Sequence, residues 1–251
     1  MTDTTLDPVV LVPVDVSGDE QPDPDLLELL SPVKVVLVGW YPVPDQTPLE
    51  QMREEYEAEA VERIETVADA FPETTDVQTV VVFTRNRGDT IDRVASDYNC
   101  DVVAVPDEVR VVERVLVPVR GDVNVDRIVA VVGGLLAESS ASATLFHAVP
   151  EDEDPTVGET LLQGVADNLV EAGVDRDRVD TELVESTSPI DDIVDAAQNH
   201  DVLVVGETDP SLIEHVLGDT LSRVVDDLQE MGFVDRRLEE DAPVATYYRL
   251  T

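Results

Sequence analysis

The sequence predicts an α/β protein made of two fused, unequal repeats of one open parallel-sheet domain. Three observations lead to this prediction: short apolar runs alternate with amphipathic segments, parts of the sequence recur, and the apolar content is sufficient for folded cores. Hydrophobic residues make up 43% of the 251 positions. This content excludes the apolar-poor profile of a disordered chain.

The internal repeat rests on two pairs of β-branched runs. Residues 10–15 (VLVPVD) recur as residues 115–120 (VLVPVR), and residues 101–106 (DVVAVP) recur as residues 201–206 (DVLVVG). Short continuous apolar runs are typical of strands that are buried on both faces of a parallel sheet. We therefore divide the chain into domains at residues 1–110 and 111–251.

Strands and helices are expected to alternate in both repeats. In the first repeat we expect strands near 8–15, 34–43, 77–84 and 101–105, helices near 48–71 and 90–99, and loops near 17–25 and 43–49. In the second we expect strands near 114–119, 142–149, 180–185, 201–206 and 243–249, helices near 125–138, 158–172, 189–199 and 211–231, and a loop near 150–158. Gly173 and Gly232 stand where helix C-caps are expected. This alternation indicates parallel strands, right-handed crossovers and helices on both faces.

Acidic residues outnumber basic ones 56 to 16, which gives a net charge of −40. Lys34 is the only lysine, and the acids are spread along the whole chain. Such a charge destabilises the compact state in dilute buffer through self-repulsion. At about 1 M salt the Debye length falls to about 3 Å, which screens most of that repulsion. The composition therefore predicts a halophilic protein from an acidic proteome.

The same charge narrows the classes of partner. No cluster of Lys and Arg could displace counterions from phosphates, so we expect no nucleic-acid partner, and anionic membrane surfaces are disfavoured. No apolar stretch approaches the ~20 residues of a membrane helix, and the N-terminus MTDTTLDPVV lacks the features of a signal peptide. We expect a cytoplasmic protein. Cys100 and the three histidines show no metal-ligand spacing, so no metal site is predicted.

Ligands of open α/β sheets bind at the carboxyl ends of the strands, near the point where the strand order reverses. The segment after the late strand of the second repeat reads GETDPSLIEHVLGDT, and a glycine at a strand end lets backbone amides approach a phosphate. The candidate binding residues of the second repeat are Arg120, Val149, Gly206, Glu207, Thr208, Ser211, Gly218, Asp219 and Thr220. Those of the first repeat are Asp15 and Ser17.

The order of these motifs resembles the universal stress protein (UspA-like) family. The similar features are the opening VLVPVD followed by Ser17, the late strand ending in VVG, the Leu217-Gly218 pair, and a final strand beginning Pro243-Val244. The resemblance covers the whole second repeat and a large part of the first. It implies tandem Rossmann-like domains of the adenine-nucleotide α-hydrolase-like type, the first one truncated. It also implies a family that is usually dimeric and in which some members bind ATP.

The ATP-binding pattern of those members is Gly, two residues, Gly, nine residues, Gly and then Ser or Thr, and it is incomplete here. Gly206 matches the first glycine, but Asp209 stands at the second and Asp219 follows Gly218. In the first repeat Pro106 replaces the glycine, and we expect the phosphate loop and its helix to be absent. Acidic side chains beside a triphosphate are repulsive. The sequence predicts no complete nucleotide site, and ATP or AMP with Mg²⁺ in the second repeat stays the alternative.

The remaining candidates favour structural roles. The sequence has no GxSxG or HExxH motif. We expect His147 to be a hydrogen-bonded histidine at the core, His200 to lie at a helix end, and His215 to lie on a helix surface. For Trp40, core packing is favoured over an interface anchor.

The sequence thus favours a non-enzymatic stress-response or regulatory protein that acts through a protein partner or self-association. The alternative is an ATP- or AMP-dependent sensor that regulates a membrane transporter. Unless Val109–Val112 supplies one, the first repeat lacks its own final strand, and the exposed edge must be covered by the other repeat or a second chain. We expect the repeats to pair within the chain as a pseudo-dimer, and leave a homodimer open.

Overall fold

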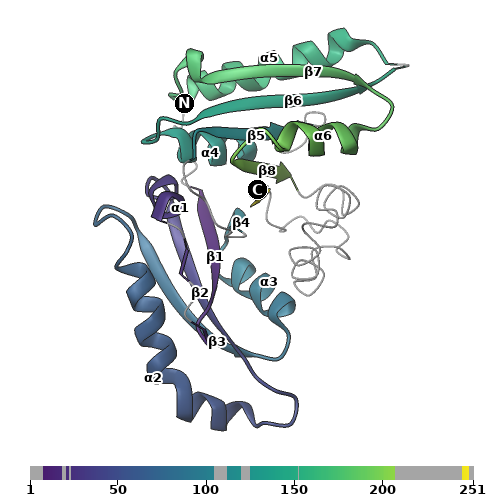
Figure 1. The fold of residues 1–251 in the computed structure, drawn as a ribbon. Coiled ribbons are helices and arrows are strands. Elements are labelled where there is room, and N and C mark those ends of the chain that lie inside the picture. The colour runs from purple at the N-terminus through teal and green to yellow at the C-terminus, as the bar shows by residue number, and fades with distance from the viewer. Residues whose placement is uncertain are drawn as a thin grey trace.

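Strands and helices alternate along the chain, as the sequence predicts (Figure 1). The computed structural model describes residues 8–18, 21–22, 24–104, 112–119, 125–151, 153–206 and 245–248. The first half contains β1 (Val9–Asp15), α1 (Pro24–Leu29), β2 (Lys34–Pro42), α2 (Leu49–Ala68), β3 (Val77–Thr84), α3 (Arg87–Asp97) and β4 (Val102–Ala104). The second contains β5 (Arg114–Pro118), α4 (Val125–Leu136), β6 (Ser142–Pro150), α5 (Pro155–Glu171), the 3₁₀ turn η1 (Arg176–Arg178), β7 (Val179–Ser186), α6 (Pro189–Ala197), β8 (Val202–Gly206) and β9 (Ala245–Tyr248).

The strands form a single nine-stranded sheet in the order β3-β2-β1-β4-β9-β8-β5-β6-β7. All neighbours are parallel except β8 and β9, which are antiparallel. The predicted parallel pairing is confirmed within each half. The two fused parallel-sheet units form one continuous sheet, because β9 uses both of its edges and joins β4 of the first half to β8 of the second. The edge of β4 is therefore covered by a strand from the other repeat.

The two halves of the sheet share one register. Val10 pairs with Val102 in the first half, and its counterpart Val115 pairs with Val202 in the second. The sequence repeat therefore corresponds to a repeat in three dimensions, in which the first strand of each half lies between the second and the fourth.

An aspartate at the start of the fourth strand explains why that run recurs. The N–H of Asp101 donates to the Val9 carbonyl at 2.8 Å, and the Asp101 carboxylate accepts from the Val9 N–H at 3.0 Å. Asp201 makes the same two contacts with Arg114, each at 2.9 Å. A charged acceptor thus satisfies a backbone donor at the start of the first strand of each half, which ties the fourth strand to it.

Helices cover both faces of the sheet. On one face α1, α2, α4 and α5 enclose a buried apolar cluster that includes Val10 and Val115. On the other face α3 and α6 enclose a second cluster that includes Leu11 and Leu116. Successive strand residues point to opposite faces, so each apolar run supplies both clusters. Each cluster contains residues of both halves, and the halves therefore share their cores.

Helix α4 also contacts the first half directly. A Cβ atom placed on Gly134 would lie 2.9 Å from Val33 Cγ1 and 3.0 Å from Pro8 Cγ. These separations are shorter than ordinary van der Waals contact, so the absence of a side chain at Gly134 lets α4 approach.

Helix beginnings account for the main local differences from the sequence predictions. α5 starts inside the predicted loop 150–158, because Asp154 caps it by accepting the Thr156 N–H at 3.0 Å. α3 starts earlier than expected, because Asn86 accepts the Asp89 N–H at 3.2 Å. Asx residues at the N-cap commonly end a loop in this way.

Helix α1 occupies part of the predicted loop 17–25, and its buried residues are Leu26, Leu27 and Leu29. At six residues it is too short to show helical periodicity. Gly173, with φ at 103°, lies directly after the C-cap of α5 as predicted. The predicted helix 211–231, Gly232, His215 and Val109–Val111 lie outside the described residues. Within the described ranges, no helix has the length and apolar character needed to cross a membrane.

Candidate functional site

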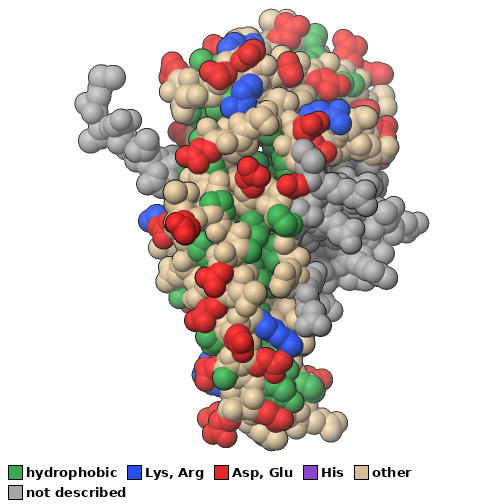
Figure 2. Space-filling view, turned by 60° about the vertical axis from the view of Figure 1, so that its left-hand side comes forward, with side chains coloured by type: hydrophobic (Ala, Val, Ile, Leu, Met, Phe, Trp, Pro, Cys, Tyr) green, Lys and Arg blue, Asp and Glu red, His purple; other side chains and the backbone are tan. Residues whose placement is uncertain are grey.

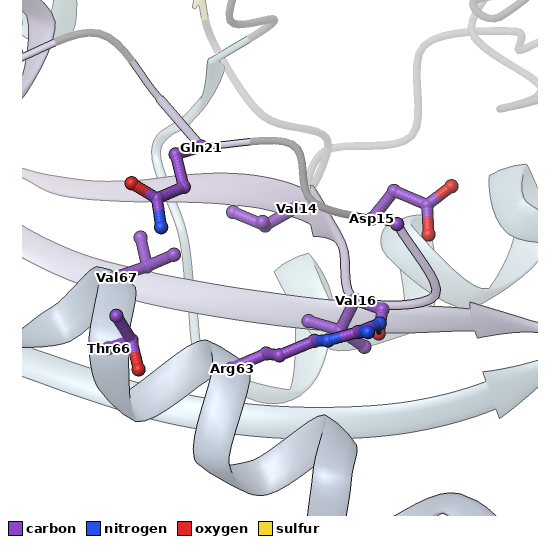
Figure 3. Close-up of a pocket in the computed structure, with 8 residues that line it drawn as sticks. Val14, Asp15, Val16, Gln21, Arg63, Thr66 and Val67 are labelled. Carbon is purple, nitrogen blue, oxygen red and sulfur yellow. Dashed lines mark hydrogen bonds between the residues drawn. The ribbon is translucent and has the colours of Figure 1, made fainter.

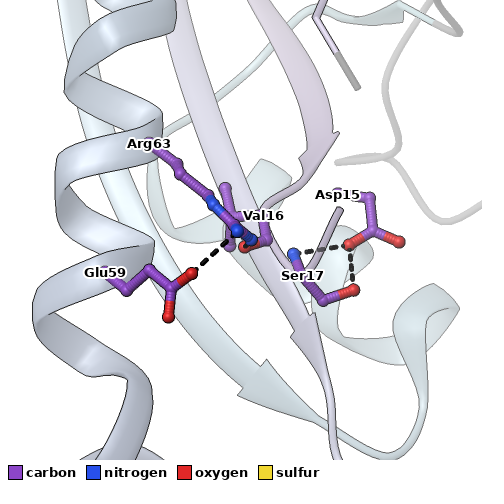
Figure 4. A network of polar contacts seen from close by, with 5 residues as sticks. All are labelled: Asp15, Val16, Ser17, Glu59 and Arg63. Carbon is purple, nitrogen blue, oxygen red and sulfur yellow. Dashed lines mark hydrogen bonds and ion pairs between the residues drawn. The ribbon is translucent and has the colours of Figure 1, made fainter. Parts of the chain in front are cut away.

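Asp15 and Ser17, the candidate residues of the first repeat, lie together at the carboxyl end of β1. Asp15 Oδ1 accepts hydrogen bonds from the Ser17 N–H at 2.8 Å and from the Ser17 hydroxyl at 2.6 Å (Figure 4). The carboxylate thus closes a local turn with its own neighbour. The structure therefore brings the predicted residues Asp15 and Ser17 together, and the two hydrogen bonds of the Asp15 carboxylate are made to Ser17.

An arginine that the sequence analysis did not select lies beside this turn. Arg63, from α2, donates to the Val16 carbonyl at 2.8 Å and forms an ion pair with Glu59 at 2.7 Å (Figure 4). Its side chain is 31% exposed, so the guanidinium is held partly within the protein. In the sequence, Arg63 is marked only by the acid Glu59 four residues before it. The same spacing is common on solvent-exposed helices, so it does not single out a site residue.

A small cavity lies next to this cluster, with a volume of about 170 Å³. Arg63, Thr66 and Val67 of α2 form one side of it, and Gln21 lies across from them (Figure 3). The remaining lining residues are Val14, Asp15, Val16 and Gly18. Sites for drug-sized ligands usually occupy roughly 300–1,000 Å³. This cavity is suited to a small polar molecule and does not enclose a whole nucleotide.

Two candidate residues of the second repeat are described. Val149, near the end of β6, is 2% exposed, and a Cβ on Gly158 of α5 would lie 3.0 Å from its Cγ2. Its side chain therefore packs between the sheet and α5. Gly206 is the last residue of β8, and its backbone pairs with Ala245 of β9. The other candidates, which are Arg120, Glu207, Thr208, Ser211, Gly218, Asp219 and Thr220, lie outside the described residues.

Two histidines have the structural roles predicted for them. His147 Nδ1 lies 2.7 Å from the Val119 carbonyl and so donates to it. His200, three residues beyond the end of α6, donates from Nδ1 to the Ala196 carbonyl at 2.8 Å, and its Nε2 lies 3.0 Å from Thr144 Oγ1. Both rings are half-buried and hydrogen-bonded, which is the expected state of a polar group at the edge of a core.

Trp40 differs in part from the expected core packing. It is only half-buried, and the guanidinium of Arg87 lies 4.6 Å from its ring centroid. This separation is within the range of a cation–π contact. On the α2 face of the sheet, Tyr41 stacks with Tyr56 and with Phe83, with ring centroids 5.2 and 5.1 Å apart.

Cys100 is buried beside the start of β4. Burial, with a smaller contribution from the charge of Asp101, raises the pKa of its thiol to about 12. Because the thiolate is the nucleophilic form, this cysteine is unsuited to covalent chemistry in the folded protein.

Comparison with known proteins identifies the fold. No protein-family model matches the sequence, and no curated protein matches it significantly. The structure is similar to a universal stress protein from Archaeoglobus fulgidus DSM 4304, with 15% identity and a TM-score of 0.56, over 97% of this chain and 96% of that chain. A functionally unknown protein from Pseudomonas aeruginosa PAO1 matches with 12% identity and a TM-score of 0.44, over 97% and 92%. The chain therefore has a universal-stress-protein-like α/β fold.

Proposed function

We propose that the chain is a non-enzymatic stress-response or regulatory protein that acts through a protein partner. The observation that carries this proposal is the closed end of β1. The acid and the arginine gathered there are engaged by the protein's own backbone and side chains. The fold similarity to a universal stress protein supports the class of function.

The cavity at this strand end supports the same proposal. Its volume of about 170 Å³ is below the usual range for an enclosed organic ligand. Arg63, the cationic side chain that lines the cavity, is already engaged by the Val16 carbonyl and by Glu59. In this proposal the first repeat is a truncated domain, and β9 occupies the place of its fifth strand.

Nucleotide titration tests the proposal. The full chain is unfolded thermally in about 1 M KCl, with increasing Mg-ATP or Mg-AMP, and we expect no stabilisation. A ligand at 100 times its Kd would stabilise the folded state by about 2.7 kcal/mol, which such a measurement resolves. A stabilisation that Asp15→Ala abolishes would assign a nucleotide to the first repeat and contradict the proposal.

A second candidate function is an ATP- or AMP-dependent sensor that uses the second repeat with Mg²⁺. It is favoured by the position of Gly206, which ends β8 beside the antiparallel neighbour β9. Open sheets bind ligands at the carboxyl ends of their strands, near the point where the strand order reverses. A nucleotide-dependent stabilisation that survives Asp15→Ala would replace the first function with this one.

We further propose that the protein works in the cytoplasm of a halophile. The net charge of −40 supports this, as do the carboxylates scattered over the visible surface (Figure 2). The free energy of unfolding should then rise as KCl increases from about 0.1 to about 2 M, since salt screens the repulsion. A stability that is unchanged or falls would contradict halophilic adaptation.

Co-purification from a halophilic host at native salt, read by mass spectrometry, tests the partner role. A protein that is recovered and binds the purified chain again would support it, and a transporter in that position would support the regulatory version. Recovery of no protein would count against a partner role.

A further inference from the structure

The described sheet ends in two outer strands, β3 and β7, which are both eight residues long. Because β9 lies between β4 and β8, each of the other described strands has a neighbour on both sides. An outer strand presents unpaired backbone N–H and C=O groups, which form a template for another chain. β3 and β7 are therefore the two places where the described sheet can be extended.

The registers align these two strands position by position. Val77 pairs with the β2 residue beside Val10, and Val179 pairs with the β6 residue beside Val115. Since Val10 and Val115 are counterparts in the repeat, Val77 and Val179 are counterparts as well. The two edges then read VQTVVVFT in β3 and VDTELVES in β7.

The aligned edges differ in charge. β7 carries acids at three positions where β3 is uncharged, which are Asp180, Glu182 and Glu185 against Gln78, Val80 and Phe83. Charges on an edge strand oppose its pairing with other strands. β7 is protected in this way, whereas β3 has no charged residue, although the chain as a whole has a net charge of −40.

The side chains and the backbone of β3 are both open to a partner. Residues 80–83 are apolar and only half-buried. Figure 2, which brings forward the left-hand side of Figure 1, shows hydrophobic side chains along the middle of the lower, N-terminal half. The Asp76 carbonyl accepts from the N–H of Val35 in β2 at 2.9 Å. The Thr84 carbonyl accepts from the N–H of Val43, which directly follows β2, at 2.8 Å. The direction of the backbone N–H and C=O groups alternates along a strand. In β3 these groups point toward β2 at even-numbered residues and away from the sheet at odd-numbered residues.

We propose that two molecules of this chain associate through β3, paired antiparallel about a two-fold axis at Val80. In this register Val77 lies opposite the partner's Phe83 and Thr79 lies opposite the partner's Val81. These are the outward-facing residues, and each pair can exchange backbone hydrogen bonds. Val80 meets its own counterpart at the closer spacing of a non-hydrogen-bonded pair, where β-branched side chains pack. The product is a closed dimer with one continuous sheet.

Charge selects a second molecule at β3 over the other extensions. Every side-chain pair within residues 77–83 is uncharged in the proposed register. The same two-fold operation on β7 would be centred on Glu182, the counterpart of Val80, and would place like charges directly opposite each other. Pairing β3 with β7 would bring acids against apolar residues and would repeat without closing.

The helix beside β3 makes the association depend on salt. α2 packs on β3, and the two-fold axis places both α2 helices on one face of the extended sheet. α2 carries a row of exposed acids, which includes Glu50, Glu54, Glu57, Glu62 and Glu65. At about 0.1 M salt the screening length is about 10 Å and these acids repel, whereas at about 1 M it is about 3 Å. The dimer should therefore form in molar KCl and dissociate on dilution of the salt.

Two matched variants test the proposal. Thr79 and Thr181 are counterparts, exposed in β3 and in β7 respectively. The full chain, T79E and T181E are compared by sedimentation equilibrium in about 2 M KCl. T79E should raise the dimer Kd at least about tenfold, because the two new carboxylates are diagonal neighbours across the strand pair. T181E should leave the Kd unchanged, and circular dichroism confirms that both variants fold.

Hydrogen exchange gives an independent readout that does not depend on substitution. The outward amides of Thr79 and Val81 should exchange slowly in the dimer and fast in the monomer at low salt, while the amides facing β2 stay protected in both. A monomer at all concentrations in molar KCl would overturn the proposal, as would a dimer that T79E leaves intact or that T181E weakens equally. A monomer whose β3 amides become protected only on adding another protein would assign the edge to a foreign strand and also overturn it. The inference does not depend on the proposed function.

Discussion

The first half of the sheet, β1–β4, and the second half, β5–β8, share strand order and register but differ at the rim. β1 leads into the six-residue α1 and ends beside a small cavity, whereas β5 is followed by the twelve-residue α4, which reaches the first half. The outer strand is uncharged in the first half and acidic in the second. The repeat therefore retains the buried middle of the sheet, and the two halves have diverged where ligands and partners would make contact.

The largest expected effect comes from the shared core. Leu11 and Leu116 are counterparts, and both are completely buried in the cluster under α3 and α6. Replacing either with alanine should lower the free energy of unfolding by about 2–5 kcal/mol. Urea unfolding followed by the fluorescence of Trp40, the only tryptophan and a residue of the first half, measures this. A Trp40 transition that Leu116→Ala does not move would show that the halves unfold separately.

The contact between α4 and the first half should give the next effect. Gly134→Ala places a Cβ within 3.0 Å of Val33 and Pro8, so it should destabilise the fold by about 1–3 kcal/mol. The control is Gly164→Ala in α5, an exposed position with no atom within 4 Å of the added Cβ. It should stabilise the fold by about 0.5–1 kcal/mol through helix propensity. Equal effects of the two variants in thermal unfolding would argue against close packing at Gly134.

The two repeated aspartates should give a smaller, graded effect. Removing the carboxylate by Asp101→Ala or Asp201→Ala leaves backbone donors without their acceptor, which costs about 1–2 kcal/mol. Asp101→Ala should cost more, because its contact with Val9 is partly buried while those of Asp201 with Glu113 and Arg114 are exposed. Asparagine at either position keeps an acceptor and should restore part of the loss. Chemical denaturation would contradict the common role if only one of the two sites responds.

The smallest expected effect concerns the buried thiol of Cys100. The pKa of Cys100 is raised by burial to about 12 from an ordinary value of 9.0, so the folded state holds the proton more tightly than the unfolded state. Its contribution to stability is therefore present below pH 9 and is lost as the pH rises toward 12. At neutral pH a thiol reagent should modify Cys100 only after unfolding. Rapid modification of the folded chain would contradict the buried position.

The sequence supported much of the fold because buried parallel strands have a clear local pattern. The predicted strand at residues 77–84 corresponds to β3, and the one at residues 142–149 corresponds to β6. The sequence repeat also anticipated that Val10 and Val115 have equivalent partners in the sheet. Helix α1 was missed because its leucines occupy less than two turns. The candidate site was anticipated only at Asp15 and Ser17, since their pairing is local. Arg63 could not be selected, because its contact with Val16 spans 47 positions in the sequence.

By itself, the sequence determined the alternation of strands and helices, the two-fold repeat and the acidic surface, because periodicity and charge act over short distances along the chain. The tertiary structure decided the position of β9, which belongs to the second repeat but pairs with β4 of the first. It also decided that β3 and β7 form the outer edges. The four residues of β9 read ATYY and carry no local signal for the strands beside which they lie. The edge that β9 takes depends on which strands already have two neighbours, and this is decided only when the whole sheet is assembled.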